Sequence, residues 1–408
     1  MKATAAHGST RNRPAAKPGR APRILTAVPI CDGHDSAIIT VNLELVRHGV
    51  EVVYLGYHRS VRDIVRAAIQ EDVQAVGLSS YNGGHIEFFD EVLAGLRRCR
   101  GKDIELFGGG GGTITTDDAR LMKRRGVHEI FAAGTSLTGM AQWVRTTYGP
   151  RPNGVGGSRP AGEFAADLEL ARKLSQVEAR GGSVPVRARD GASGSSGARV
   201  RNNGSMESSK ATPVIGITGP GGAGKTTLID ELVLRFLARR PTGRLAILAH
   251  DPGAPGKGAL LGDRATMVNS QHDRVFMRSL ATTGHAGGLS SVSRGCLQVL
   301  RHAGFDLVLV ESSGIGQEDL PFRRGLVDRQ ILVLSPEYGG GLQLQKIQML
   351  DAADIVVVNK SDRAGARTAL AEIEQRLAHN QRGQKLMATV AKRHRDPGAD
   401  RLFEEVMR

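Results

Sequence analysis

The sequence has few aromatic residues, few cysteines and no long apolar segment. Aromatic side chains make up 4% of its 408 residues, with 3 cysteines and 1 tryptophan. Cys31, Cys99 and Cys296 lie far apart, without a CxxC pair or a His-rich cluster beside them, so we expect reduced thiols in a cytoplasmic protein. No apolar run approaches the roughly 18 residues that a membrane-spanning helix requires, so we expect no such helix.

Positive charge is concentrated in two stretches. The formal net charge is +14, and residues 1–23 (six basic, no acidic) and 179–212 (six basic, two acidic) together account for ten of these charges. The second stretch is rich in Gly, Ser and Arg, which is typical of a flexible linker. The first lacks the apolar region of a secretory signal and is interpreted as a solvated tail, with a transit peptide or a nucleic-acid arm as alternatives. A nucleic-acid partner is therefore not expected for the folded parts.

The remaining chain forms two blocks with the composition of a soluble globular protein, 40% hydrophobic and 24% charged. The first block contains five short apolar runs, at 24–29, 50–56, 74–80, 103–108 and 128–132, separated by amphipathic segments. Such β/α alternation predicts a doubly wound, flavodoxin-like parallel sheet. Ligands of these sheets bind beyond the carboxyl ends of the strands, so the loops after the strands are the candidate site.

Three of these loops carry distinctive residues. Asp32 and His34 follow the first strand, a pairing in which a carboxylate can orient an imidazole that binds a metal. Ser79 and Tyr81 follow the third strand, and five consecutive glycines, residues 108–112, follow the fourth. Glycine allows a backbone to approach a large flat ligand closely.

Taken together, these loops resemble the cobalamin-binding domain of adenosylcobalamin-dependent acyl-CoA mutases. The resemblance implies that His34 is the lower axial cobalt ligand with Asp32 behind it, and that the dimethylbenzimidazole tail enters a channel. Two positions depart from the family motifs, since Ala37 replaces a glycine and Tyr81 a leucine. The implied cobalamin-binding residues are Asp32, His34, Ser79, Tyr81, Gly111, Gly112 and Gly134.

The second block opens with an apolar strand, residues 212–218, followed by a GxxxxGK[ST] motif and an amphipathic helix at 225–238. In this context the glycines free backbone N–H groups for phosphate oxygens, Lys225 neutralises β/γ charge, and the Thr226 hydroxyl reaches Mg²⁺. The predicted phosphate-binding residues are Gly219, Gly221, Gly222, Ala223, Gly224, Lys225, Thr226 and Thr227.

A second motif selects the nucleotide. Asn359, Lys360 and Asp362 form an NKxD pattern at the end of an apolar strand. The carboxylate can accept two hydrogen bonds from guanine, and adenine lacks that donor pair, so the pattern favours GTP over ATP. Residues 389–391 are a candidate for one further backbone contact to the base.

Acidic groups suited to magnesium lie between these motifs. Glu311 ends an apolar strand, and Gly314 completes an ExxG segment whose N–H can reach a γ-phosphate. Asp251 ends another strand, and Asp263 lies in the segment GALLGDR. On position alone, Asp251 and Asp263 are equally compatible with solvated loop carboxylates.

This second block resembles the G-protein chaperones of cobalamin-dependent mutases. The resemblance implies that Lys225, Asp251, Asp263 and Glu311 serve hydrolysis, and that Thr226 and the three carboxylates serve magnesium. A cobalamin domain followed by such a GTPase is similar to part of the fused isobutyryl-CoA mutase family, which implies adenosylcobalamin, GTP and Mg²⁺ as cofactors. The acyl-CoA-binding mutase barrel of that family has no counterpart in this sequence, and we expect it as a partner in cis or in trans.

The sequence therefore predicts a tail at 1–22, a cobalamin-binding domain at 23–150, a linker at 151–211 with a helix at 162–178, and a GTPase domain at 212–408. That helix is interpreted as lying between the domains, with dimerisation as an alternative. A truncated fusion and a split subunit both remain possible at this point. So do a cobalamin sensor or carrier without a mutase, and a paralogue that has lost catalysis.

Overall fold

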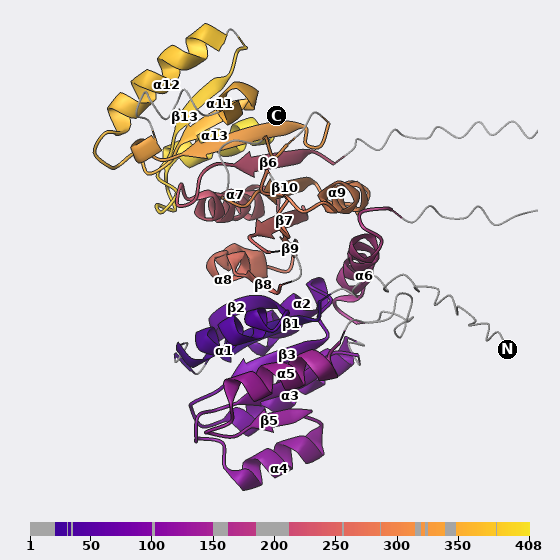
Figure 1. Cartoon of the computed structure of the whole chain (residues 1–408). Coiled ribbons are helices and arrows are strands. Elements are labelled where there is room, and N and C mark those ends of the chain that lie inside the picture. The colour runs from indigo at the N-terminus through magenta and orange to yellow at the C-terminus, as the bar shows by residue number, and fades with distance from the viewer. Residues whose placement is uncertain are drawn as a thin grey trace, which may run out of the picture.

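The structure is a computed structural model with two parallel β-sheets, each flanked by helices on both faces (Figure 1). It describes residues 21–30, 32–33, 36–99, 103–149, 162–184, 212–254, 257–285, 287–314, 320–322, 325–338, 348–380 and 382–408. Most of the expected tail and linker, His34, and the segments 315–319 and 339–347 lie outside these residues. The doubly wound α/β class expected for both blocks is confirmed.

The first sheet has the strand order β5-β4-β3-β1-β2-β8, all parallel. Its first five strands follow the flavodoxin-like order 2-1-3-4-5, in which the chain changes direction between β1 and β3. The strands are β1 (Arg23–Pro29), β2 (Glu51–Arg59), β3 (Ala75–Ser79), β4 (Glu105–Gly109), β5 (Glu129–Phe131) and β8 (Ala259–Leu261). The helices are α1 (Ser36–Arg47), α2 (Val61–Gln70), α3 (His85–Arg98), α4 (Thr116–Arg125) and α5 (Leu137–Thr147).

The central strands of this sheet, β1 and β3, are buried on both faces, which explains their continuous apolar runs. Every residue of β1 and of β3 is buried. Two helices begin at complete capping boxes, Ser60 with Asp63 for α2 and Thr115 with Asp118 for α4, so the chain marks these starts locally.

The second sheet is also parallel, with the order β13-β12-β11-β6-β10-β7-β9. Its strands are β6 (Val214–Thr218), β7 (Leu245–Asp251), β9 (Val275–Ala281), β10 (Leu307–Glu311), β11 (Arg329–Leu334), β12 (Ile355–Val358) and β13 (Lys385–Ala388). The α-helices are α7 (Lys225–Arg239), α8 (Asp263–Thr266), α9 (Ser293–Arg301), α11 (Gln348–Ala352), α12 (Ala366–Asn380) and α13 (Pro397–Val406), with short 3-10 helices η1 (Val268–Gln271) and η2 (Pro336–Tyr338). The neighbours of β6 are β10 and β11, so its loop opens where the chain changes direction, the usual ligand position in such sheets.

The strand β8 departs from the predicted domain organisation. We expected the segment GALLGDR, residues 258–264, to belong to the GTPase block, with Asp263 in a loop. Within this segment, Ala259 to Leu261 instead form a short strand that pairs with β2 of the first sheet, with Glu51 opposite Ala259 and Val53 opposite Leu261. Leu261 is fully buried and belongs to the first domain's core. The two blocks therefore share a sheet.

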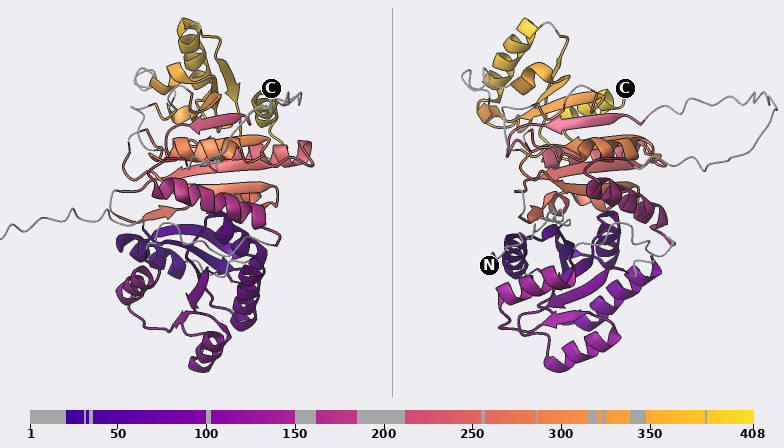
Figure 2. Two further views of the ribbon diagram at one scale, coloured as in Figure 1. Left: turned by 90° about the vertical axis from the view of Figure 1, so that its right-hand side faces the viewer. Right: turned by 45° about the vertical axis from the view of Figure 1, so that its right-hand side comes forward.

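The helix expected at 162–178 is observed as α6 (Ala165–Ala179). It contacts α2 of the first domain and α9 of the second, and it lies beside the boundary of the two domains in Figures 1 and 2. Its buried residues Leu170, Ala171 and Leu174 join the core of the second domain, while Leu168 joins that of the first. This is the arrangement that the inter-domain interpretation requires.

The edge strand β9 faces the first domain, and side chains satisfy its backbone. Gln70 accepts a hydrogen bond from the Met277 N–H (3.3 Å) and donates to the Val275 carbonyl (2.9 Å). The Ser279 N–H donates to Glu71, at 3.1 Å from both carboxylate oxygens. Arg264 donates to the Met277 carbonyl at 2.6 Å, and Arg23 donates to that of Ser279 at 3.2 Å. An otherwise open sheet edge is thus closed by polar and charged side chains.

Among the described residues, no helix has the length and apolar character needed to cross a bilayer.

We expect Leu261→Ala to destabilise the first domain even though this residue lies in the second block of the sequence. Removing a fully buried leucine costs about 2–5 kcal/mol. The readout is urea-induced unfolding followed by the fluorescence of Trp143, the 1 tryptophan of the chain, which packs against Phe107 and Phe131 of the first domain. The control is Leu43→Ala on α1, where the side chain is 46% exposed, with an expected change within about 0.5 kcal/mol. An unchanged Trp143 transition in Leu261→Ala would contradict the shared sheet.

Candidate functional site

The predicted phosphate-binding loop connects β6 to α7 in the conformation that the motif requires. Gly219, Gly222 and Gly224 have positive φ angles of 145°, 75° and 90°, a region that other residues rarely adopt. The Gly221 N–H donates to the Gly314 carbonyl at 3.0 Å, which places the ExxG segment against this loop. A Cβ added at Gly314 would lie 2.8 Å from Gly221 Cα and 3.0 Å from Lys225 Nζ. The close approach explains why glycine stands at position 314.

Lys225 and the three predicted carboxylates converge beside this loop. Burial lowers the pKa of Lys225, and the charges of Glu311 and Asp263 oppose that shift. Burial raises the pKa of Asp251 to about 8, reinforced by Asp263, and burial raises that of Asp263 to about 6 against the opposing charge of Lys225. Burial and Asp263 also raise the pKa of Glu311 well above its usual range. A divalent cation would stabilise carboxylates buried this close to one another.

The arrangement fits a magnesium ion held jointly with a nucleotide. The Thr226 hydroxyl lies 2.8 Å from Glu311 Oε1. Asp251 Oδ2 and Glu311 Oε2 are buried and have no hydrogen-bond partner among the residues that the structure describes. No three His, Cys, Asp or Glu side chains of the described chain segments are close enough to hold a metal by themselves. A cation here therefore needs the hydroxyl, water or phosphate oxygens as additional ligands, which is the usual coordination of Mg²⁺.

The predicted base-recognition residues lie together at the end of β12. Asn359 accepts hydrogen bonds from the Thr389 hydroxyl (3.1 Å) and the Ala391 N–H (3.0 Å), and it donates to the Ala223 carbonyl of the phosphate-binding loop (2.9 Å). Lys360 Nζ donates to the Gly222 carbonyl at 2.5 Å. The structure thus brings the NKxD motif, residues 389–391 and the phosphate-binding loop into one site.

Asp362, which is expected to bind the guanine edge, pairs here with Lys392 at 2.5 Å. The hydrogen bond from Lys392 lowers the pKa of Asp362 and keeps the carboxylate ionised. Lys392 itself is 67% exposed, so the side chain has room to swing away. A base with two N–H donors can then take its place on the carboxylate.

A buried histidine that the sequence did not single out supports this site. His250 Nδ1 lies 2.7 Å from the Glu311 carbonyl, and its Nε2 lies 2.7 Å from the Ser293 hydroxyl. Because a carbonyl oxygen only accepts, Nδ1 of the neutral ring carries the hydrogen. The Ser293 hydroxyl has one hydrogen, which it can donate either to His250 Nε2 or to the Ser290 carbonyl at 2.7 Å. Burial lowers the pKa of His250 to about 4. The neutral ring therefore joins the end of β10 to the start of α9.

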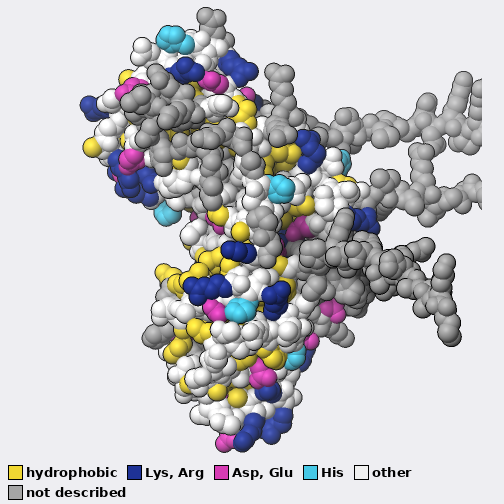
Figure 3. Space-filling model, in the orientation of Figure 1, with side chains coloured by type: hydrophobic (Ala, Val, Ile, Leu, Met, Phe, Trp, Pro, Cys, Tyr) yellow, Lys and Arg dark blue, Asp and Glu magenta, His cyan; other side chains and the backbone are white. Residues whose placement is uncertain are grey.

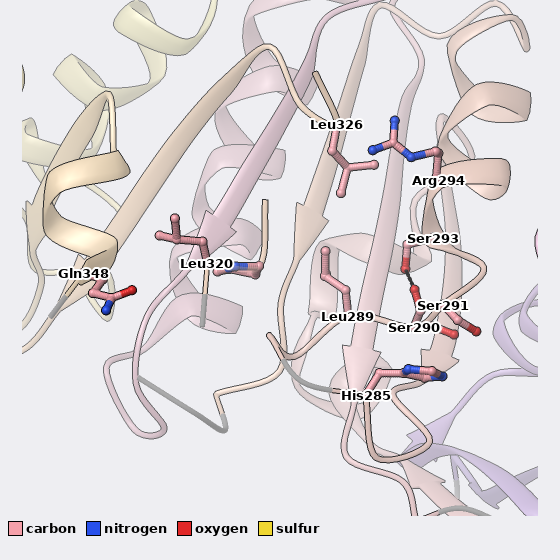
Figure 4. Close-up of a pocket in the computed structure, with 10 residues that line it drawn as sticks. His285, Leu289, Ser290, Ser291, Ser293, Arg294, Leu320, Leu326 and Gln348 are labelled. Atoms are coloured by element: carbon pink, nitrogen blue, oxygen red, sulfur yellow. Dashed lines mark hydrogen bonds between the residues drawn. The ribbon is translucent and has the colours of Figure 1, made fainter. Parts of the chain in front are cut away.

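Ser293 also lines a cavity of about 500 Å³ in the second domain (Figure 4). In this view Ser293 points toward Ser290, whose carbonyl its hydroxyl meets at 2.7 Å. The walls also include His285, Arg294, Leu326 and Gln348, which come from several elements of the second domain. This cavity is separate from the phosphate-binding loop.

The first domain contains a cavity of about 360 Å³ where the chain changes direction between β1 and β3. Its walls are mainly apolar and come from the strand ends and from helices α1 and α5. The cavity-lining residues include Thr26, Ile38, Val41, Leu78, Ser79, Tyr81, Phe107, Gly108, Gly109, Gly110, Gly111, Phe131, Leu137 and Met140. From the sequence, we identified Ser79, Tyr81 and the glycine run but missed the apolar residues of the walls. The one sequence signal for these residues is that they lie near strand ends.

The glycine run shapes this cavity. A Cβ added at Gly110 would lie 2.1 Å from the Ser80 carbonyl oxygen, and one at Gly111 would lie 2.1 Å from the Tyr81 ring. Larger residues would therefore displace the neighbouring loop. Within the described chain, the Thr26 hydroxyl is buried without a hydrogen-bond partner beside this cavity. A flat apolar ring with polar atoms at its rim, such as the tail of cobalamin, fits these walls.

The other predicted cobalamin residues are placed less centrally. Asp32 is fully buried at the end of β1 and accepts a hydrogen bond from the Tyr81 N–H, which ties the first loop to the third. Gly112 and Gly134, with φ angles of 106° and 83°, are not among the residues that line the cavity. His34 lies outside the described residues, although its neighbour Gly33 is described.

Comparison with known protein families agrees with this geometry. Residues 175–408, more than half of the chain, match the model of the methylmalonyl-CoA mutase-associated GTPase MeaB. The chain belongs to this family. Residues 22–139 match the B12-binding domain model, so a MeaB-type GTPase domain follows a B12-binding domain on one chain.

Individual relatives carry both parts. The chain is 37% identical over 419 residues to a fused isobutyryl-CoA mutase of Cupriavidus metallidurans, covering 96% of this chain and 36% of that protein. It is 38% identical over 400 residues to a fused isobutyryl-CoA mutase of Geobacillus kaustophilus, covering 93% and 36%. A protein of Pyrococcus horikoshii named as a GTPase is 43% identical over 155 residues, or 38% of this chain and 48% of that protein. The chain thus spans about a third of the length of the fused mutases.

We expect His250→Asn to flatten the pH dependence of stability in mild acid. The pKa of His250 is 6.5 in the unfolded chain and about 4 in the folded chain, so between these pH values the unfolded chain binds a proton that the folded chain does not. The contribution of His250 to the free energy of unfolding is therefore fully present above pH 6.5 and is lost as the pH falls toward 4. The loss is at most on the order of 3 kcal/mol. Asparagine retains a donor for the Glu311 carbonyl without this titration.

The measurement is urea unfolding from pH 4 to pH 8, with His302→Asn on the exposed end of α9 as the matched control. The same slope in His250→Asn and the parent protein would show that His250 does not titrate in this way.

Proposed function

We propose that this chain is the cofactor-handling part of an acyl-CoA mutase system, in which GTP binding and hydrolysis gate the loading of adenosylcobalamin. The observation that carries the proposal is β8. The segment between Asp251 and Asp263 of the GTPase site contains β8, a strand of the B12-binding domain's sheet. A change at the nucleotide site therefore acts on the same sheet that forms the cobalamin cavity.

For the GTPase site, we assign phosphate binding to residues 219–227 and guanine recognition to Asn359, Lys360 and Asp362. Thr226, Asp251, Asp263 and Glu311 would hold Mg²⁺, directly or through water, and would position the attacking water. The buried and unpartnered oxygens of Asp251 and Glu311 support this assignment, since a dication would stabilise carboxylates that are otherwise costly to bury. The N–H of Gly314 would meet the γ-phosphate.

For the cobalamin site, we assign the cobalt ligand to His34 and its orienting carboxylate to Asp32. Ser79, Tyr81 and Gly111 would contact the tail in the cavity, and Gly112 and Gly134 would flank it. The bound cofactor supplies the radical chemistry that a mutase barrel applies to its acyl-CoA substrate. This chain's residues bind that cofactor and exclude water from its tail.

The partner that we propose is a mutase barrel, in cis or in trans, in a cytoplasmic assembly. Of the seven large hydrophobic side chains that are exposed among the described residues, five belong to the B12-binding domain: Ile30, Ile39, Leu43, Tyr57 and Leu137. They lie at strand ends and on the helices that line the cavity, where a partner would cover them. On the face shown in Figure 3, Lys and Arg side chains form separate small groups among hydrophobic, acidic and other side chains.

We expect Asp362→Asn to reduce GTP affinity by roughly 10- to 100-fold, because one carboxylate that accepts two hydrogen bonds is lost. The amide can still accept from N1–H and can donate to a carbonyl at position 2, so xanthosine triphosphate should bind the variant better than the parent. Binding is measured calorimetrically with Mg²⁺, and Asp351→Asn at an exposed ion pair of the same domain is the control. Unchanged preference for GTP in Asp362→Asn would refute the base assignment.

We expect His34→Ala to abolish the absorption spectrum of cobalamin bound through a protein imidazole. The comparison variant is His58→Ala, because His58 lies beside the same loop, with Cε1 3.7 Å from the Cβ position of Gly33. His58→Ala should leave the spectrum intact. If His58→Ala removed the signal and His34→Ala did not, the ligand assignment would be wrong. GTP turnover should be unchanged in both variants, so this test does not bear on the GTPase assignment.

A further inference from the structure

Arg264 links the GTPase site to the B12-binding domain. It is the residue after Asp263, and it is fully buried. Its guanidinium donates to Glu71 Oε1 through Nη2 at 3.0 Å and through Nε at 3.2 Å. Glu71 is the C-cap residue of α2 in the other domain and is 193 residues away in sequence. Because two guanidinium nitrogens donate to the same carboxylate oxygen, the contact fixes the orientation of the Arg264 guanidinium as well as its distance from Glu71.

Glu71 is fully buried and is itself held by several donors. The Ser279 N–H lies 3.1 Å from both carboxylate oxygens, and the Ser279 hydroxyl lies 3.0 Å from Oε1. Arg23 Nη1 lies 3.4 Å from Oε2, and Arg278 Nε lies 4.0 Å from it. A carboxylate with this many donors has one orientation, so Arg264 has a rigid partner.

The segment around Asp263 is anchored to the B12-binding domain on both sides. Before it, the Gly258 N–H donates to the Val46 carbonyl at 3.2 Å, and β8 pairs with β2. After it, Arg59 donates to the Ala265 carbonyl at 2.9 Å. The backbone on both sides of Asp263 is therefore held by contacts from the B12-binding domain.

We propose that Glu71 is a positioning residue of the GTPase reaction, supplied by the B12-binding domain. By holding Arg264, Glu71 keeps the adjoining Asp263 in place beside Asp251 and Glu311. Glu71 touches neither nucleotide nor magnesium in this scheme. The inference rests on the catalytic roles proposed for Asp251 and Asp263, and it adds that hydrolysis depends on a side chain of the other domain.

The surrounding charges provide a matched comparison. Glu178 of α6 belongs to the same buried cluster, since it pairs with Arg23 at 3.1 Å and with Arg278 at 2.5 Å. The hydrogen bonds described for Glu178 come from Arg23 and Arg278. A general loosening of the cluster would follow from removing either charge, but a loss of positioning would follow only from removing Glu71.

The experiment compares steady-state GTP hydrolysis of the full chain and of Glu71→Gln and Glu178→Gln, with Mg²⁺ titrated in each. We expect Glu71→Gln to lower kcat by roughly 10- to 100-fold, the effect of misplacing a catalytic group by about 1 Å. The KM for GTP should change by less than about threefold, because the guanine and phosphate contacts are untouched. The Mg²⁺ concentration at which GTP hydrolysis reaches half its maximal rate should be higher in Glu71→Gln than in the parent protein. Glu178→Gln should retain the parent kcat.

Arg264→Lys serves as the second variant, because it keeps the charge and loses the two-point contact. It should reproduce the kcat loss of Glu71→Gln while Trp143 fluorescence shows a folded protein. Equal kcat values in the parent and Glu71→Gln, or equal losses in Glu71→Gln and Glu178→Gln, would overturn the inference. If the parent itself hydrolyses no GTP, the proposed function fails instead, so the two failures are distinguishable.

Discussion

The backbone of β9 must be hydrogen-bonded although no strand of the described chain lies beyond it. The architecture depends on how this edge is closed. The donors and acceptors come from Gln70 and Glu71 at the end of α2, from Arg23 of β1 and from Arg264. A sheet edge that ends in charged side chains of another domain cannot accept a further strand, and it cannot slide without exposing buried charge. The domain interface is therefore specific in register as well as in position.

This edge also explains why so much charge is buried between the domains. Three fully buried arginines, Arg23, Arg264 and Arg278, meet the carboxylates of Glu71 and Glu178 in one cluster. Desolvating such groups offsets much of their mutual attraction, so the cluster contributes little net stability, whereas losing one member leaves a buried charge unpaired. Its contribution is to fix one arrangement of the two domains, and the nucleotide site and the cobalamin cavity share that arrangement.

Much of the fold, and the motifs of both sites, could be predicted from the sequence, because they are local in sequence. Buried parallel strands appear as continuous apolar runs, and the phosphate-binding loop carries its own glycine signature. The strand β8 could not be predicted, since three residues, Ala259 to Leu261, give no periodicity and their partner strand is about 200 residues earlier. The pairing of Glu71 with Arg264 was missed for the same reason, and His250 was missed because a buried histidine in an apolar strand has no distinguishing pattern.

The sharing of a sheet has a consequence for how the two halves can be separated. A fragment that ends after the fifth strand of the B12-binding domain would leave β2 without its outer neighbour, exposing a row of unpaired N–H and C=O groups flanked by apolar residues. Such an edge invites pairing between copies, so the excised domain would tend to self-associate or aggregate. To obtain the B12-binding domain as a soluble fragment, residues 257–264 should therefore be included with it, either fused to the fragment or added as a separate peptide.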